Sequence, residues 1–214
     1  MRALTANRST PVSIYALDVT DPGALRAAAQ DFIARHGVPD VVIANAGISV
    51  GTEGCRAEDV AVLASIMQVN VIGLAATLQP FIAPMRAQRA GVLVGIASVA
   101  GLRGFAGVGA YNASKSAAIT WLESLRVELA GSGVDVLTIC PGYVATPMTA
   151  GNRYPMPFLL SAPEAARRIA RAIAARRRLA IIPWQMRVAA FFLRRMPTWL
   201  FDRLFARAPR KARN

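Results

Sequence analysis

YNASKSAAITWLESLRVEL, residues 111–129, is predicted to form a helix in which Tyr111 and Lys115, four residues apart, share one face. Of the 25 basic residues in the chain, only Lys115 and Lys211 are lysines, so a lysine here is unusual. A nearby ammonium favours the ionised form of a phenol and lowers its pKa, which is ordinarily near 10. Arginine does not substitute freely, because its charge lies on a broad planar group. The pair therefore predicts a tyrosine that exchanges protons near neutral pH.

Short apolar segments alternate with helical patterns along the rest of the chain. Strands are expected at residues 11–19, 40–47, 91–98, 133–140 and 179–183, and helices at residues 20–37, 57–89, 109–130 and 161–178. The long helix at 57–89 is expected to be disturbed near Pro80 and Pro84. Apolar strands that alternate with helices form a parallel sheet covered on both faces, with ligands at the carboxyl ends of the strands. The pattern predicts an α/β fold with a doubly wound sheet.

Composition restricts the chemistry and the location of the chain. With 214 residues and 54% hydrophobic residues, it is expected to form a folded domain rather than a disordered chain. A single histidine, His36, argues against a histidine triad and a zinc site, so no metal is expected. Cys55 and Cys140 fit no metal or redox spacing and indicate reduced thiols in a cytoplasmic protein. No signal peptide and no membrane-spanning helix are expected.

Further motifs occur in a fixed order around the tyrosine and the lysine. They are Asp18-Val19, the turn ANAG at 44–47, Asn70 in the long helix, Ser98 thirteen residues before Tyr111, and PGYVAT at 141–146. In this order and spacing, the chain resembles the short-chain dehydrogenase/reductase (SDR) family from about residue 11 to residue 183. Ala44 stands where the family has a first asparagine.

This resemblance implies a Rossmann-type fold and an NAD(P)-dependent oxidoreductase that interconverts an alcohol and a ketone. Tyr111 would exchange a proton with the substrate oxygen, while Lys115 would lower the pKa of Tyr111 and bind the nicotinamide ribose. Ser98 would bond to the substrate oxygen, and Asn70 would hold a water that connects Lys115 to solvent. The residues expected to contact NAD or NADP are Asp18, Val19, Asn45, Ala46, Gly47, Tyr111, Lys115, Pro141, Gly142, Val144 and Thr146.

The family also begins with a strand, a glycine-rich turn and a helix that bind the cofactor pyrophosphate. The sequence contains no such glycine pattern. We therefore expect an N-terminally truncated sheet of about five strands and weak cofactor binding by the chain as written. Two interpretations remain open. The chain is an enzyme read from an internal methionine, or it is a shortened, non-catalytic remnant that acts as a binding or membrane-surface module.

Charge divides the chain into two parts. Residues 163–214 carry 14 basic and 2 acidic side chains, whereas residues 1–162 carry 11 basic and 10 acidic ones. We expect an incomplete NAD(P)-binding SDR domain at 1–183 and a basic amphipathic helical tail at 184–214, broken at Pro197. Arginines beside Trp184 and Trp199 suit peripheral contact with a membrane surface. The alternative is a tail that packs on the body or across a dimer.

The remaining expectations concern partners. The loop after Thr146 is rich in apolar and aromatic residues, which favours an apolar alcohol or ketone as the small-molecule substrate. Nucleic acid is not expected, because the basic charge follows no recognised binding motif. The resemblance further implies a homo-oligomer in the full-length form.

Overall fold

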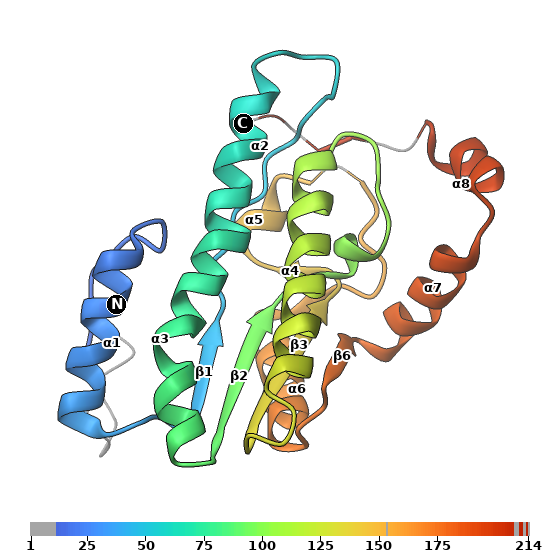
Figure 1. Ribbon diagram of the computed structural model, residues 1–214. Coiled ribbons are helices and arrows are strands. Elements are labelled where there is room, and N and C mark those ends of the chain that lie inside the picture. The colour runs from blue at the N-terminus through green and yellow to red at the C-terminus, as the bar shows by residue number, and fades with distance from the viewer. Residues whose placement is uncertain (1–11, 153, 208–209, 212, 214) are drawn as a thin grey trace.

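The computed structural model describes residues 12–152, 154–207, 210–211 and 213. At its centre lies a parallel sheet of four strands in the order β1–β2–β3–β6 (Figure 1). The strands are β1 (Val41–Ala44), β2 (Gly91–Ile96), β3 (Val134–Pro141) and β6 (Leu179–Ile182). A separate parallel pair consists of β4 (Val144–Ala145) and β5 (Leu160–Ser161). This arrangement confirms the α/β class predicted from the alternation of apolar segments and helices.

The boundaries of a few helices follow capping side chains. Asp21 accepts a hydrogen bond from the Ala24 amide at the start of the first helix, and Gly37 ends that helix with a φ of 77°. Ser161 likewise accepts a bond from the Glu164 amide. The helices are α1 (Pro22–His36), α2 (Asp59–Met67), η2 (Gln68–Gly73), α3 (Leu74–Ala87), η3 (Val99–Leu102), α4 (Gly109–Glu128), α5 (Pro147–Ala150), α6 (Ala162–Ala174), α7 (Trp184–Arg195) and α8 (Thr198–Phe205).

Helices cover both faces of the sheet, because alternate residues of the strands are buried on opposite sides (Figure 1). Leu93 of β2 packs with Leu78 of α3 and Leu122 of α4 in one core cluster. Its neighbour Val94 belongs to the second cluster, which includes Ala172 of α6. The strands are therefore apolar on both faces, as predicted for a doubly wound sheet.

The prediction of a strand at residues 11–19 is wrong. Residue 11 lies outside the described residues, and residues 12–18 form no strand. Tyr15 instead donates a hydrogen bond to Asp31 of α1 at 2.6 Å, so the segment is tied to a helix. In the described chain β1 pairs only with β2, and no strand lies beside residues 12–18 to give the backbone a ladder. The sheet has four strands rather than about five.

The long helix predicted at 57–89 corresponds to α2, η2 and α3, from Asp59 to Ala87. Its irregular part is a π-helical turn at Gln68–Gly73, not the neighbourhood of Pro80 and Pro84, which both lie inside α3. The backbone takes up one extra residue at η2, and such turns are frequent at functional sites. The predicted disturbance was therefore wrong in position and cause.

By length and composition alone, this helix could cross a membrane. Its side chains argue for a place in the protein core, because Ile66, Leu78 and Met85 are fully buried. Leu78 and Met85 pack with the strands in the first core cluster. We therefore interpret Asp59–Ala87 as a helix that places one face in the core and leaves apolar side chains such as Val60 and Ile72 exposed.

The tail contains two helices, α7 and α8, on either side of Pro197, as the sequence indicates. Arg103 of the loop after η3 donates to the carbonyls of Leu193 and Met196, which ends α7 against the body. The Arg103 guanidinium also lies 4.3 Å from the centre of the Phe201 ring of α8. One face of the tail therefore packs on the body, which is the alternative to a membrane contact that the sequence left open.

Gly101 of η3 allows the closest approach between that turn and α4. A Cβ atom at Gly101 would lie 2.6 Å from the carbonyl carbon of Lys115 and 2.7 Å from its oxygen. Neither backbone group can move without displacing α4, so we expect Gly101→Ala to lower the free energy of unfolding by about 1–3 kcal/mol. Urea denaturation measures the change. Gly104→Ala is the matched control, because a Cβ there meets nothing within 4 Å. Equal stability of the two variants would contradict this packing.

Candidate active site

The site forms at the carboxyl ends of β1, β2 and β3, where the sequence places most of its polar motifs. Lys115, on the first turns of α4, donates a hydrogen bond from Nζ to the Ile96 carbonyl at 2.9 Å. Ile96 ends β2, and Ser98 follows two residues later. Helix and strand end are thus joined directly through the lysine side chain.

Asn70 connects the long helix to the turn after β1. It lies in the π-helical turn and is fully buried. Its Oδ1 accepts a hydrogen bond from the Ile48 amide at 2.8 Å, and its Nδ2 donates to the Ile48 carbonyl at 3.0 Å. The same Nδ2 donates to Ser114 Oγ on α4 at 3.0 Å. The side-chain amide of Asn70 therefore fixes the turn after β1, η2 and α4 relative to one another.

Gly47 leaves room beside this amide. A Cβ atom at Gly47 would lie 3.2 Å from Asn70 Oδ1 and 3.4 Å from Lys115 Nζ. The turn residue, the asparagine and the lysine predicted for the site therefore meet at one point. The glycine is required there for space, because its backbone φ is not among the positive ones.

Ser98 lies between η3 and β3. Its Oγ accepts a hydrogen bond from the Ala100 amide at 3.1 Å, which starts η3, and lies 3.5 Å from the Pro141 carbonyl. The Ser98 hydroxyl also acts on Tyr111 by lowering the pKa of its phenol. Ser98 and Tyr111 thus face a common space at the ends of β2 and β3.

The balance of forces on Tyr111 differs from the sequence expectation. Burial raises the pKa of Tyr111, and the hydrogen bond with Ser98 opposes this effect without overcoming it. Lys115 Nζ lies 5.8 Å from the centre of the Tyr111 ring and bonds to Ile96 instead. In the protein chain by itself, Tyr111 is therefore held as a neutral phenol, and a pKa lowered by Lys115 with the help of the cofactor's charge stays a prediction.

The residues predicted to contact the adenosine half of the cofactor lie less close together than those around Tyr111. Val19 packs closely on η2, since a Cβ at Gly73 would lie 3.0 Å from the Val19 carbonyl oxygen. Asp18 is exposed and accepts a hydrogen bond from the Thr20 amide at 2.8 Å, which lowers the pKa of its carboxyl. Asn45 and Ala46 are exposed at the end of β1. Among the described residues, no hydrogen bond joins Asp18 to either of them.

The predicted loop 141–146 is held by backbone pairing. The Gly142 amide donates to the Ile182 carbonyl at 2.7 Å, and Val144 of β4 pairs with Leu160 of β5. Thr146 begins α5 in a reciprocal cap, in which its amide donates to Thr149 Oγ1 at 3.1 Å. The loop is therefore fixed at both ends beside the Tyr111 site.

Two residues that sequence reasoning missed support α4. The Ser114 hydroxyl accepts a hydrogen bond from the Asn70 side-chain amide and donates one to the Tyr111 carbonyl at 2.8 Å. Asn112 donates to the Ala100 carbonyl at 2.7 Å and accepts from the Phe105 amide. Both lie inside the stretch 111–115, but a small polar residue on a helix gives no pattern from which its partner can be predicted.

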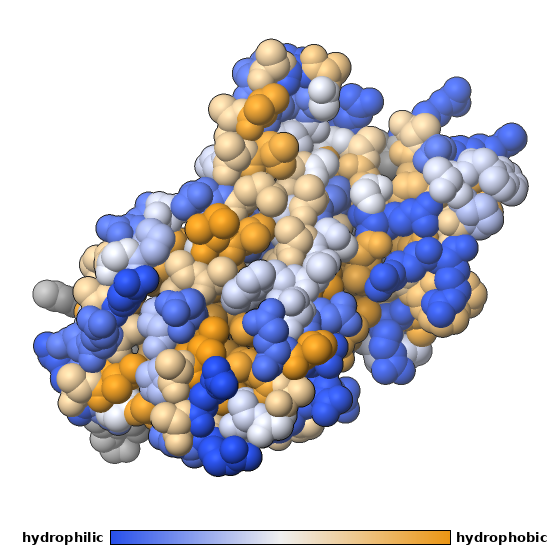
Figure 2. All heavy atoms as spheres, in the orientation of Figure 1, coloured by the Kyte–Doolittle hydropathy of each residue, from blue (hydrophilic) through white to orange (hydrophobic). Residues whose placement is uncertain are grey.

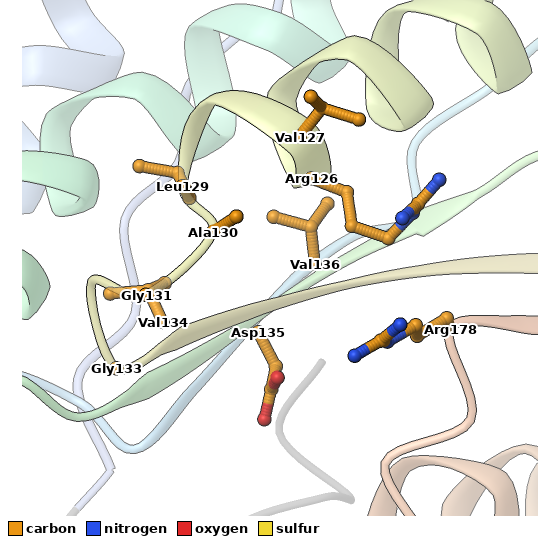
Figure 3. A pocket seen from close by; sticks show the side chains of 10 residues that line it. All are labelled: Arg126, Val127, Leu129, Ala130, Gly131, Gly133, Val134, Asp135, Val136 and Arg178. Carbon is orange, nitrogen blue, oxygen red and sulfur yellow. The ribbon is translucent and has the colours of Figure 1, made fainter.

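A cavity of about 440 Å³ lies at the opposite end of the sheet, where α4 ends and β3 begins (Figure 3). Arg126 and Arg178 extend along its edge, and Asp135 lies below them (Figure 3). Because ligands of this sheet type bind at the carboxyl ends of strands, the position argues against an active site. We assign it no role.

Comparisons with known proteins agree with this geometry. The family model of short chain dehydrogenases matches residues 1–156. An uncharacterized oxidoreductase of Myxococcus xanthus is 39% identical over 186 residues, which cover 87% of this chain and 73% of that protein. A 2-(R)-hydroxypropyl-CoM dehydrogenase of Xanthobacter autotrophicus is 39% identical over 62% of this chain, and the match spans only 54% of that protein. A crystal structure of a short chain dehydrogenase from Burkholderia cenocepacia in complex with NADP has a TM-score of 0.76 at 23% identity. That match covers 88% of this chain and 76% of that one.

The chain belongs to the short-chain dehydrogenase family. The fold and the class of enzyme inferred from the sequence, an NAD(P)-dependent oxidoreductase, are thereby confirmed.

Burial also changes the pKa of Lys115. The loss of hydration lowers the pKa of Lys115 from 10.5 to about 8. We expect its side-chain carbon signal to titrate near pH 8 in NMR spectra of protein made with isotope-labelled lysine, in which only Lys115 and Lys211 contribute. The variant Lys115→Met assigns the signal. A midpoint near the ordinary value of 10.5 would contradict the burial of this ammonium.

This pKa also predicts how stability depends on pH. The unfolded chain keeps the proton up to about pH 10.5, while the folded chain releases it near pH 8, so Lys115 makes folding more favourable as the pH rises between these values. Cys140, whose pKa burial raises to about 12, acts in the opposite direction. The difference in unfolding free energy between wild type and Lys115→Met isolates the lysine contribution.

Proposed function

We propose that this chain carries the catalytic site of an oxidoreductase that interconverts an alcohol and a ketone with NAD or NADP. The observation that supports this most directly is the meeting of Asn70, Ser98, Tyr111 and Lys115 at the carboxyl ends of β1, β2 and β3. Lys115 bonds to the end of β2, Ser98 to the end of β3, and Asn70 to the turn after β1.

The residues present fit the nicotinamide half of the cofactor. Lys115 is an almost fully buried ammonium, and Gly47 keeps the space beside it open. Lys115 would hold the ribose hydroxyls, while the Val144 backbone and Thr146 would orient the carboxamide. Asp18, Val19, Asn45 and Ala46 would contact the adenosine half, and Pro141 and Gly142 would shape the loop between them. When bound, the cofactor supplies the hydride chemistry.

The neutral phenol of Tyr111 is the acid that ketone reduction requires. Tyr111 would donate its proton to the substrate oxygen, and Ser98 would hold that oxygen by a second hydrogen bond. The resulting phenolate would be stabilised by the Lys115 ammonium, because the attraction between opposite charges is stronger in a partly dry site than in water. In the direction of alcohol oxidation, the same lysine would favour the phenolate that accepts the proton.

An apolar substrate fits the surface around this site. Met148 in α5, and Phe158 and Leu159 on the segment between α5 and β5, expose 41%, 50% and 45% of their surface. Tyr143 and Tyr154 add aromatic rings whose centres are 6.3 Å apart. We propose that these side chains cover the hydrophobic part of the substrate.

Removal of the Tyr111 hydroxyl tests the proposal. In protein that turns over a ketone, Tyr111→Phe should reduce kcat at least about a hundredfold, because the ring remains but the proton donor is lost. Cofactor affinity, measured by calorimetric titration, should change little. The control Tyr15→Phe removes a hydroxyl that donates to Asp31 of α1, outside the site, and should leave kcat unaltered. Near wild-type kcat in Tyr111→Phe would reject the assignment and favour the non-catalytic remnant.

A homo-oligomer is also proposed, supported by exposed apolar side chains along the long helix, where Figure 2 shows orange patches. Val60, Leu63 and Ile72 expose 68%, 38% and 47% of their surface. A second copy of the chain would cover such an apolar face. The proposal is tested by measuring the molar mass of the protein in solution, which should exceed that of one chain.

We further propose that the tail makes peripheral contact with an anionic membrane surface. While Met186 and Ala190 face the body, Trp184, Phe191 and Phe192 of α7 expose 66%, 51% and 63% of their surface. Trp199 of α8 is 69% exposed. Charged and apolar side chains alternate over these helices in Figure 2. Arginine beside exposed aromatic rings suits the boundary between headgroups and acyl chains.

The membrane contact is tested with vesicles of phosphatidylcholine and phosphatidylserine at low salt. The double variant Trp184→Ser with Trp199→Ser should bind several-fold less than wild type, because it removes the rings that would enter the interface. A matched control, Val12→Ser with Val127→Ser, removes exposed apolar side chains outside the tail and outside the proposed oligomer face. Equal losses in both double variants, or none in either, would reject the tail as the contact.

A further inference from the structure

The segment that follows α8 returns to the site. Its described residues Arg210, Lys211 and Arg213, here called the strap, contact the loop after β1 and the start of α2. Arg213 forms two hydrogen bonds with Asp59, at 2.6 and 2.7 Å, and Arg210 pairs with Glu53 at 3.0 Å. The strap therefore joins parts of the chain that are more than 150 positions apart in sequence.

The anchor at Asp59 is stronger than an ordinary surface pair. Only 6% of Asp59 is exposed, and the pKa of its carboxyl is lowered by the Glu53 amide and by Arg213. A two-point bond between a guanidinium and a mostly buried carboxylate fixes both distance and direction. Arg210 adds a close fit, since a Cβ at Gly107 would lie 2.7 Å from its own Cβ. These contacts set the position of the residue between them.

Lys211 is the residue between them, and it reaches toward the site. Its Nζ donates to Ser49 Oγ at 2.9 Å and to the Met148 carbonyl at 3.3 Å. Ser49 follows Ile48, whose backbone is held by Asn70, and Met148 lies two residues after Thr146. The Lys211 ammonium thus connects the turn that Asn70 holds with the segment proposed to cover the substrate.

The charge of Lys211 is not balanced as the other strap charges are. Both arginines pair with carboxylates, whereas Lys211 bonds to a hydroxyl and a carbonyl, and no carboxylate among the described residues lies within 4.0 Å of it. The side chain is partly withdrawn from water, which lowers its pKa. A half-buried ammonium with neutral partners retains a positive potential that a nearby anion would stabilise.

We propose that Lys211 determines specificity by binding an anionic group, such as a carboxylate, at the end of an apolar carbonyl substrate. The inference deepens the proposed function and depends on it, because the anion would lie between Ser49 and Met148 while the carbonyl reaches Tyr111. In this arrangement the strap brings a cation to the turn after β1 and to α5, where it bonds to the Ser49 hydroxyl and the Met148 carbonyl.

A first experiment needs no turnover. The protein is prepared with isotope-labelled lysine, so that its NMR spectrum contains signals from Lys115 and Lys211 only. The probes are a medium-chain keto acid and its primary amide of the same length. We expect the keto acid to shift the Lys211 signal in a saturable way and the amide to leave it in place. The variant Lys211→Gln assigns the signal, and a separate titration with NADP distinguishes substrate from cofactor.

A second experiment measures selectivity as the ratio of kcat/KM for the keto acid to that for the amide. A hydrogen bond to a charged group contributes about 1.5–3 kcal/mol, so Lys211→Gln should lower this ratio about tenfold or more. Lys211→Arg, which keeps the charge, should retain part of the preference. Arg213→Gln should also lower the ratio by releasing the strap. Arg207→Gln is the control, because it removes an exposed charge shortly before the strap.

Several results would overturn the inference. They are a Lys211 signal that keto acid and amide shift equally, a shift produced by NADP but not by the keto acid, and an unchanged ratio in Lys211→Gln. Failure of the proposed function is recognised separately, since it would appear as normal turnover in Tyr111→Phe. A Lys211 shift specific to the keto acid would support the anion site even in protein without turnover.

Discussion

The buried amide of Asn70 is the contact on which the rest of the site depends. It bonds to both backbone groups of Ile48 and to Ser114, and so fixes the turn after β1, the π-helical turn and α4 relative to one another. Lys115 completes the arrangement by reaching the end of β2. If the amide were lost, the two half-buried backbone groups of Ile48 would lose this partner, while Ser114 would keep its bond to the Tyr111 carbonyl. An unsatisfied buried polar group costs about 1–3 kcal/mol.

The chemistry of Tyr111 follows from where its neighbours place their charge. Lys115 is close in sequence, yet its ammonium is committed to the Ile96 carbonyl, and burial therefore governs the phenol. At neutral pH burial keeps Tyr111 as a neutral phenol, while Lys115 still carries its proton because its pKa is lowered only to about 8, and a polar ligand that enters the site would change this balance. Proton transfer would then be coupled to ligand binding, so that reactivity appears only with substrate and cofactor in place.

Local signals in the sequence predicted the strands β1, β2, β3 and β6 and the shared helix face of Tyr111 and Lys115, which depend on short-range patterns such as four residues between two side chains. The place of Ser98 beside Tyr111 was instead implied by the resemblance to the family. Residues 12–18 failed as a strand because a strand also needs a neighbour, which the segment itself does not encode. The π-helical turn and the return of Lys211 to the site depend on distant contacts and left no local pattern.

The edge of the sheet at β1 has a consequence for behaviour in solution. In the described chain this strand pairs on one side only, and Val41 and Ile43 leave 39% and 46% of their surface uncovered. The unpaired amides and carbonyls of such a strand can template a ladder with any extended segment of another molecule. No proline or charged side chain interrupts the stretch VVIA to prevent it. Crowding therefore favours disordered growth of intermolecular sheets, a route distinct from assembly through the long helix.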